Sequence, residues 1–173
     1  LVTLVSYRDV IYPGLRELDR IERGKPDDPY HVVSDAENYH ALEALAYCMP
    51  GKVDCIYIDP PYNTGAKDWK YNNNYVESTD QYRHSKWLAF MERRLKLARQ
   101  LLNPQDSVLI VTIDEKEYLR LGLLLEQLFP EATIQMVSDV INPAGVVRKG
   151  QLSRSNEFLY FVMFGDAVPG VLP

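Results

Sequence analysis

Four consecutive residues, Asp59-Pro60-Pro61-Tyr62, place a carboxylate and an aromatic ring directly after the apolar run "VDCIYI". Two successive prolines lack backbone N–H groups and interrupt a β-ladder, so this tip is stiff and rich in hydrogen-bond acceptors. An ionised aspartate and the Pro60 carbonyl could accept both hydrogens of a planar amino group while Tyr62 stacks on the ring that bears it. Such a grip favours the positive charge that develops when the nitrogen attacks an electrophile. The structural alternative is a rigid turn with a buried tyrosine.

Metal and nucleophile chemistry are the other candidates. Asp35, Asp59 and Asp114 each follow a predicted strand, and an oxygen-only magnesium site is one alternative use of them. The three histidines do not pair at ligand spacing, and no two glycines are separated by a single residue, as a phosphate-cradling loop would need. No serine stands in a nucleophile-elbow context. We therefore expect no metal and favour the amino-group grip.

The elements that must position the tip alternate along the chain. Helical apolar spacing predicts a short piece at 15–23 and helices over 36–48, 85–102 (with Ser85 as N-cap) and 115–129. Short apolar, β-branched-rich runs predict strands over 30–35, 53–58, 107–114, 133–142 and 157–165. Residues 63–82 form a long polar loop, a type that is often functional. The last two strands are joined without a helical pattern, which predicts an antiparallel pair.

This order predicts an α/β protein with a mostly parallel sheet and an antiparallel C-terminal strand pair. Apolar runs such as 53–58 are typical of strands covered on both faces. Ligands of such sheets bind at the carboxyl ends of the strands, where Asp35, the 59–62 tip and Asp114 are expected to converge. We divide the chain into an N-terminal arm (1–30), a catalytic unit (31–165) and a tail (166–173).

Length, composition and charge limit the classes of protein to which the chain can belong. With 173 residues, 46% of them hydrophobic, the chain has the size of one globular domain. A net charge of −5 argues against nonspecific coating of nucleic acid, although Arg148, Lys149 and Arg154 cluster in a glycine-containing loop where phosphate contact is plausible. Nothing approaches the roughly 18 consecutive apolar residues of a membrane span. Cys48 and Cys55 cannot build a disulfide framework and are expected to be buried thiols in a reducing cytoplasm.

The tip and its surroundings resemble a known family. The segments "IYIDPPYNTG", "YNNNYV", "YRHSKWLAFMERRLKLARQLL", "SVLIVTID" and "VINPAGVVRKGQLSRSNEFLYFVMFG" closely resemble the β-group amino DNA methyltransferases, above all the modification subunits of type III restriction systems. The resemblance covers residues 30–165. It implies a Rossmann-like methyltransferase fold and methyl transfer from S-adenosylmethionine to the exocyclic N6 of adenine.

The resemblance also implies roles for individual residues. Asp59 and the Pro60 carbonyl would hold the amino group of an adenine flipped out of double-stranded DNA, with Pro61 stiffening the tip and Tyr62 stacking on the base. Asp35, Ala36 and Asp59 would lie beside the cofactor. Asn63, Lys86 and Trp87 would line the rim of the pocket, with core packing as the alternative for Trp87. Arg148 and Lys149 complete the expected substrate contacts.

One departure bears on the extent of the enzyme. β-group enzymes carry a Phe-x-Gly-x-Gly cofactor loop after the catalytic half, and this sequence has none. We therefore expect the catalytic half of a longer bacterial or archaeal enzyme, inactive or nearly so alone. The resemblance further implies a homodimer and a restriction-subunit partner. RNA adenine or protein glutamine methylation is the enzymatic alternative, although glutamine-directed relatives usually begin the motif with Asn. A noncatalytic nucleic-acid-binding module is the alternative of another class.

Overall fold

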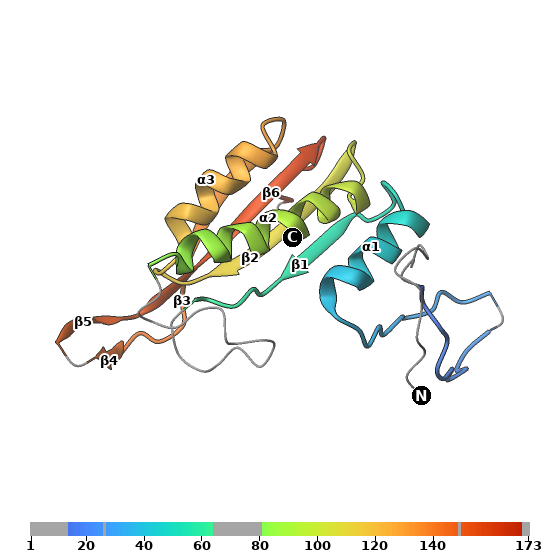
Figure 1. Ribbon diagram of the computed structural model, residues 1–173, viewed down its shortest axis with the longest axis horizontal. Coiled ribbons are helices and arrows are strands. Elements are labelled where there is room, and N and C mark those ends of the chain that lie inside the picture. Colours follow the sequence, from blue (N-terminus) through green and yellow to red (C-terminus); the bar gives the residue numbers. More distant parts are fainter. Residues whose placement is uncertain (1–13, 26, 64–80, 149, 171–173) are drawn as a thin grey trace.

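The computed structural model describes residues 14–25, 27–63, 81–148 and 150–170, without the side chains of residues 146–148 and 151. Its elements follow the order expected from residue 36 onward (Figure 1). They are α1 (Asn38–Cys48), β1 (Cys55–Ile58), α2 (Arg83–Leu101), β2 (Asp106–Ile113), α3 (Tyr118–Leu128), β3 (Thr133–Val140), β4 (Val146–Arg148), β5 (Gln151–Arg154) and β6 (Asn156–Gly165).

Four strands form one sheet in the order β1-β2-β6-β3. β1 and β2 are parallel, with Ile56 opposite Leu109, whereas β6 runs antiparallel to both β2 and β3. β1, β2 and β3 therefore share one direction, and β6 is inserted between β2 and β3 against it. The predicted antiparallel pairing of the last two long strands is confirmed, and three strands of the four point the same way.

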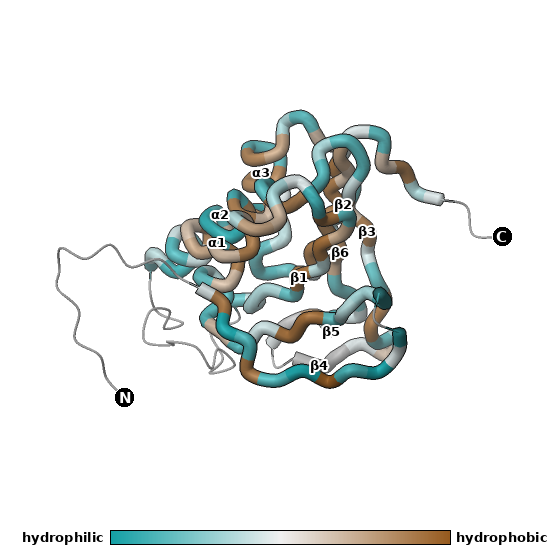
Figure 2. The backbone as a smooth tube through the Cα atoms, turned by 90° about the vertical axis from the view of Figure 1, so that its right-hand side faces the viewer, coloured by the Kyte–Doolittle hydropathy of each residue, from teal (hydrophilic) through white to brown (hydrophobic). Residues whose placement is uncertain are grey.

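The core lies between the sheet and the helices α2 and α3, which cover the same face, while α1 contacts α2 and adds no residue to this core (Figure 2). On α2, Trp87, Met91 and Leu95 recur every four residues, and each is at most 1% exposed. This spacing places them on one side of the helix, as the sequence predicts. They pack against the alternate buried residues of β2 and against α3, whose Leu121 and Leu125 face inward. The N-termini of α2 and α3 thereby lie beside the end of β1.

Three expectations about local structure are wrong. Residues 15–23 are not helical, and residues 30–35 form no strand; Val33 is 95% exposed there. A β-branched run becomes a strand only when a neighbour pairs with it, and among the described residues none does. α2 begins at Arg83 rather than after Ser85, with no side-chain cap at Tyr82. The connection between β3 and β6 also contains the hairpin β4–β5, which no pattern in the sequence predicts.

The expected cover of β1 on both faces is also wrong, because only the face that carries Ile56 and Ile58 packs against the core. The residues of β1 alternate between exposed and half-buried, and Tyr57 is 62% exposed. The other face also carries Cys55, which is exposed, and Cys48 at the end of α1 is exposed too, so both free thiols differ from the expected burial. Within the described ranges, no helix is long and apolar enough to cross a membrane, and no His, Cys, Asp and Glu side chains cluster as metal ligands would.

Candidate functional site

The tip begins where β1 ends, and its first side chain is tied to the neighbouring strand. Asp59 is exposed, and its Oδ1 accepts a hydrogen bond of 2.7 Å from Thr112 Oγ1. Thr112 lies near the end of β2, which pairs in parallel with β1, so both strand ends meet at one edge of the sheet. The bond fixes one carboxylate oxygen of Asp59, and no group in the described part of the chain donates to the second oxygen.

The second tie holds the backbone of the tip. Trp87 Nε1 donates a hydrogen bond of 2.7 Å to the Pro61 carbonyl. Trp87 is fully buried on α2, so it lies in the core and not at a pocket rim, which corrects that expectation. The indole therefore occupies the carbonyl of Pro61, and no described group donates to that of Pro60. Pro60 itself is buried, so the acceptor that the grip requires has no described donor but little exposed surface around it.

Tyr62 is held at its hydroxyl. The half-buried side chain donates to Oε2 of Glu157, the second residue of β6, at 3.2 Å. Burial, together with the nearby carboxylates of Asp59 and Glu157, raises the pKa of Tyr62 above its ordinary value of 10.0, so the phenol stays protonated and keeps its donor. The ring is thus anchored at its far end rather than free to rotate.

Asn63 closes the tip in a conformation that few residues adopt. Its φ of 56° is left-handed, a region that asparagine tolerates better than most side chains. The side chain is buried, and its Nδ2 donates to Glu117, a fully buried carboxylate that precedes α3. Asn63 Oδ1 has no donor among the described residues. A buried carboxylate such as that of Glu117 is stable only when several donors satisfy it.

Glu117 obtains further donors from α2 and α3. His84 Nδ1 lies 2.5 Å from Glu117 Oε1, and Arg120 Nη1 lies 3.5 Å from Oε2. His84 Nε2 accepts from Arg83 Nε at 3.3 Å, so a neutral His84 carries its proton on Nδ1 and donates it to Glu117. The starts of two helices are therefore joined to the residue that follows Tyr62.

Arg154, one of the basic residues for which the sequence suggests phosphate contact, is paired with carboxylates of the protein itself. The guanidinium pairs with Glu115 at 2.7 Å, Glu157 at 2.9 Å and Asp114 at 3.4 Å. Asp114 is buried after β2, and that burial raises the pKa of its carboxyl from 3.8. Arg154 is thus an internal cation, and Asp114 is a structural partner of it rather than an open acid at the sheet edge.

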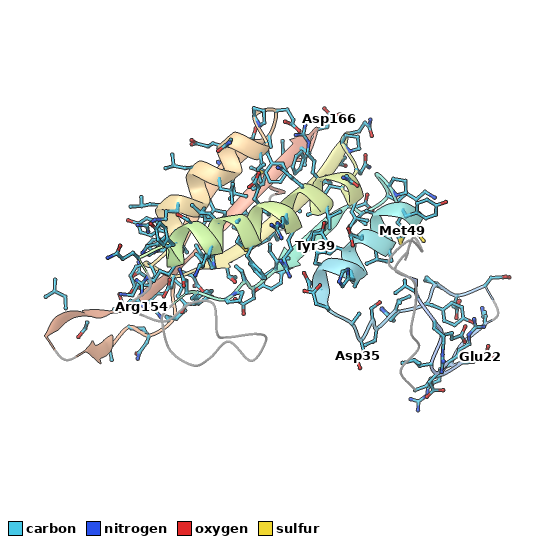
Figure 3. All side chains as sticks on the ribbon, in the orientation of Figure 1. Glu22, Asp35, Tyr39, Met49, Arg154 and Asp166 are labelled. Carbon is cyan, nitrogen blue, oxygen red and sulfur yellow. The ribbon has the colours of Figure 1, made fainter. Side chains whose placement is uncertain are left out.

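The structure places the predicted cofactor residues differently from the expectation. Asp35 and Ala36 are exposed, just before α1, and Asp35 does not end a strand. Figure 3 shows Asp35 well apart from Arg154, and Arg154 reaches the tip through Glu157. The predicted convergence of Asp35 with the tip is therefore not seen. Lys86 is exposed on the first turn of α2, Arg148 ends β4, and Lys149 lies outside the described residues.

Sequence reasoning missed four residues of this site: Thr112, Glu117, Arg154 as an ion-pair centre, and Glu157. Two of them carried a weak signal. Glu157 is a charge at the head of an apolar strand, and Glu117 directly precedes the apolar face of α3. A charge at such a place is depleted unless it is paired. Their partners lie far away along the chain, so the pattern alone could not name them.

The resulting arrangement fits an amino-bearing planar ligand. Asp59, the Pro60 carbonyl and Asn63 Oδ1 are acceptors, and no backbone N–H competes at Pro60 or Pro61. Tyr62 adds an aromatic face. A set of acceptors beside one ring suits the amino groups of an adenine or of an adenosyl cofactor better than it suits an anion.

Comparisons with known proteins agree with this chemistry. A family model described as DNA methylase (N6_N4_Mtase) matches residues 53–164. The probable type III restriction-modification enzyme HindVI Mod subunit of Haemophilus influenzae is 40% identical over 65% of this chain and 14% of its own length. The type III restriction-modification enzyme EcoPI Mod subunit of Escherichia phage P1 is 29% identical over 75% of this chain and 24% of its own length. The type II methyltransferase M.KpnI of Klebsiella pneumoniae is 33% identical over 66% of this chain and 28% of its own length.

Among solved structures, the M1.HpyAVI–SAM complex aligns with 78% of this chain and 55% of its own, at 17% identity and a TM-score of 0.48. The chain spans only 14% to 28% of the length of the three relatives above. The family match covers most of the chain and includes the tip, β2, α3 and β6. It confirms the expected methyltransferase fold and, because DNA methylases take their methyl group from S-adenosylmethionine, the expected cofactor. The chain belongs to the DNA methylase family of N6- and N4-directed amino methyltransferases.

Proposed function

We propose that this chain is the catalytic half of an adenine-specific DNA methyltransferase of a restriction-modification system. The observation that supports this most is the Asp59–Tyr62 tip. Asp59, Pro61 and Tyr62 are held by β2, α2 and β6 respectively, while one Asp59 carboxylate oxygen and the Pro60 carbonyl have no donor among the described residues. A rigid pair of acceptors beside an aromatic ring suits an amino group on a base.

In this proposal, Asp59 and the Pro60 carbonyl accept the two hydrogens of adenine N6, and Tyr62 stacks on the base. S-adenosylmethionine supplies an electrophilic methyl group. The N6 lone pair forms the new N–C bond as the S–C bond breaks, and N6 releases its extra proton afterwards. The acceptors stabilise the positive charge on N6 during the transfer, so no general base is needed beforehand. Asp35, Ala36 and Asp59 remain proposed cofactor contacts.

The target base must leave the DNA stack to reach this tip, at a cost of about a few kcal/mol. Asn63 and Lys86 are proposed to border the flipped base, and Arg148 and Lys149 of the β4–β5 hairpin to contact phosphates. An exposed hairpin beside the tip suits contacts to the DNA backbone, which position the duplex without reading its sequence.

The wider assembly is also proposed from the relatives. Type III Mod subunits are named among them, so a restriction subunit, a homodimer and a cytoplasmic location in bacteria or archaea belong to this proposal. The short coverage of those relatives suits the division into an arm (1–30), a catalytic half (31–165) and a tail (166–173), with further cofactor and recognition elements elsewhere in a longer protein.

Nucleoside mass spectrometry tests the proposal. The full-length protein is expressed in a bacterial strain without adenine methylation, and DNA and RNA are digested separately. We expect N6-methyladenine in DNA with the wild type and none with Asp59→Ala. N4-methylcytosine in DNA would reassign the base, and N6-methyladenine confined to RNA would favour the RNA-directed alternative. DNA binding without any methylated nucleoside would favour the noncatalytic module.

A further inference from the structure

The carboxylate of Glu157 has one partner on each oxygen. Its Oε2 accepts from the Tyr62 hydroxyl at 3.2 Å, and its Oε1 accepts from Arg154 Nη2 at 2.9 Å. Glu157 is 22% exposed and Arg154 is 18% exposed at the side chain. The carboxylate therefore cannot rotate without breaking the bond to Tyr62 or the bond to Arg154.

Arg154 is fixed in turn by the end of β2. Its Nη1 donates to Glu115 Oε2 at 2.7 Å and lies 3.4 Å from Asp114 Oδ2. A guanidinium is planar, and its nitrogens diverge at fixed angles, so bonds at both Nη1 and Nη2 determine its orientation. The three carboxylates thus hold one cation, and that cation orients the carboxylate that binds Tyr62.

A tyrosine that stacks on a base needs its ring plane fixed before the base arrives. An unanchored ring rotates about two side-chain bonds, and stopping that rotation costs binding free energy when the base stacks. A hydrogen bond at the hydroxyl, far from the Cα atom, restrains the ring most effectively. Glu157 therefore performs at Tyr62 what Thr112 performs at Asp59.

We propose that Glu157 is a positioning residue for methyl transfer, which acts through the Tyr62 hydroxyl and is itself oriented by Arg154. This inference rests on the proposed function of the tip. Arg154 is the last residue of β5, so the anchor of Tyr62 also forms the base of the β4–β5 hairpin. Contacts that the hairpin makes with DNA are thereby joined to the ring that receives the base.

A double-mutant cycle in the full-length protein tests the inference. Methyl transfer to unmodified bacterial DNA is measured for the wild type, Tyr62→Phe, Glu157→Gln and the double variant, with kcat and KM determined separately. Phenylalanine keeps the stacking ring and loses the hydroxyl. The amide of glutamine has an acceptor oxygen at only one of the two positions that Oε1 and Oε2 occupy, so it cannot accept from Arg154 at one and from Tyr62 at the other. Glu131→Gln is the matched control. Glu131 makes an exposed ion pair with Arg99, at 2.5 Å between the charged atoms, and this pair does not involve the tip.

We expect each single variant to lower kcat/KM about 10-fold, the order expected for one hydrogen bond to a charged group, and the double variant to be no worse than the lower single one. Glu131→Gln should stay within about 2-fold of the wild type, as exposed ion pairs contribute little. If Glu157→Gln fails to fold by circular dichroism, Arg154→Lys replaces it in the cycle, since lysine keeps the charge but not the two-sided geometry.

Two results would overturn the inference, and they are distinguishable. A double variant about 100-fold below the wild type, the product of two independent losses, would show that Glu157 does not act through Tyr62, while the proposed function stands. A wild-type protein that transfers no methyl group to DNA would overturn the proposed function and this role with it.

Discussion

The indole Nε1 of Trp87 donates a 2.7 Å hydrogen bond to the carbonyl of Pro61, although the two residues are 26 positions apart. This bond ties the start of α2 to the middle of the tip and takes the carbonyl next to the one that the proposed grip uses. Trp87 is therefore both a core residue and the support of the site, since its ring fills the core while its single donor reaches the tip.

Replacing Trp87 by phenylalanine should separate these two roles. The variant loses the donor to Pro61 and leaves part of the buried indole volume empty, so we expect a loss of about 2–4 kcal/mol in the free energy of unfolding. Methyl transfer should fall as well, because the tip is no longer held. Tyr160→Phe is the matched control: the Tyr160 hydroxyl donates to the Tyr118 carbonyl at 2.8 Å, away from the tip. Urea unfolding measures the stability of both variants, and kcat/KM measures their methyl transfer. An equal loss of activity in the two variants would contradict the role of Trp87 as a support of the tip.

Removal of the Glu117 carboxylate should destabilise the fold. Asn63 and His84 both donate to Oε1 of the fully buried Glu117, and Arg120 Nη1 lies 3.5 Å from Oε2, so in Glu117→Gln the amide NH2 must face either these two donors or the guanidinium. We expect a loss of about 1–3 kcal/mol in the free energy of unfolding by urea. Glu126→Gln makes the same chemical change on an exposed position of α3 and should be neutral. A Glu117→Gln variant as stable as Glu126→Gln would show that the buried carboxylate is not needed.

The left-handed backbone at Asn63 gives a prediction that runs against ordinary residue preference. Glycine adopts a φ of 56° without strain, whereas alanine does not. Asn63→Ala and Asn63→Gly both lose the bond to Glu117, so their difference isolates the backbone term. We expect Asn63→Gly to be more stable by about 1 kcal/mol in thermal unfolding. The reverse order would mean that Asn63 leaves the left-handed region in solution.

Burial of Asp114 predicts a pH-dependent difference in stability. Because burial raises its folded-state pKa above 3.8, the protonated form is favoured in the native protein. This contribution to stability is fully present below 3.8 and is lost as the pH rises through the raised value. Relative to Asp114→Asn, which does not titrate, the wild type should therefore become less stable over that interval. Urea unfolding of both proteins at a series of pH values measures the difference, and a pH-independent difference would contradict it.

The tip and the main elements could be predicted because their signals are local. Two prolines after an apolar run mark the end of β1, and the four-residue spacing of Trp87, Met91 and Leu95 marks the buried face of α2. The contacts around the tip could not be predicted, because they join distant residues. Tyr62 and Glu157 lie 95 positions apart, and no periodicity links them.

The absent strand at residues 30–35 has a related cause. A run such as "YHVVSD" has the composition of a strand, but a strand exists only as part of a ladder, and Val32 and Val33 remain exposed without one. The placement of Asp35 depended on that strand, so the error in one element displaced a predicted site residue. Asp59 escaped this error because the strand before it pairs with β2.

The most direct test of the central claim is methyl transfer by the full-length protein with and without the Asp59 carboxylate. Tritiated S-adenosylmethionine is incubated with unmodified DNA and, in parallel, with RNA, using the wild type, Asp59→Ala and the control Glu131→Gln. We expect label in DNA from the wild type and the control, and a loss of about 100-fold or more with Asp59→Ala, the order expected when a group that stabilises the transition state is removed. Transfer by Asp59→Ala at the rate of the control would contradict the claim that this carboxylate holds the amino group.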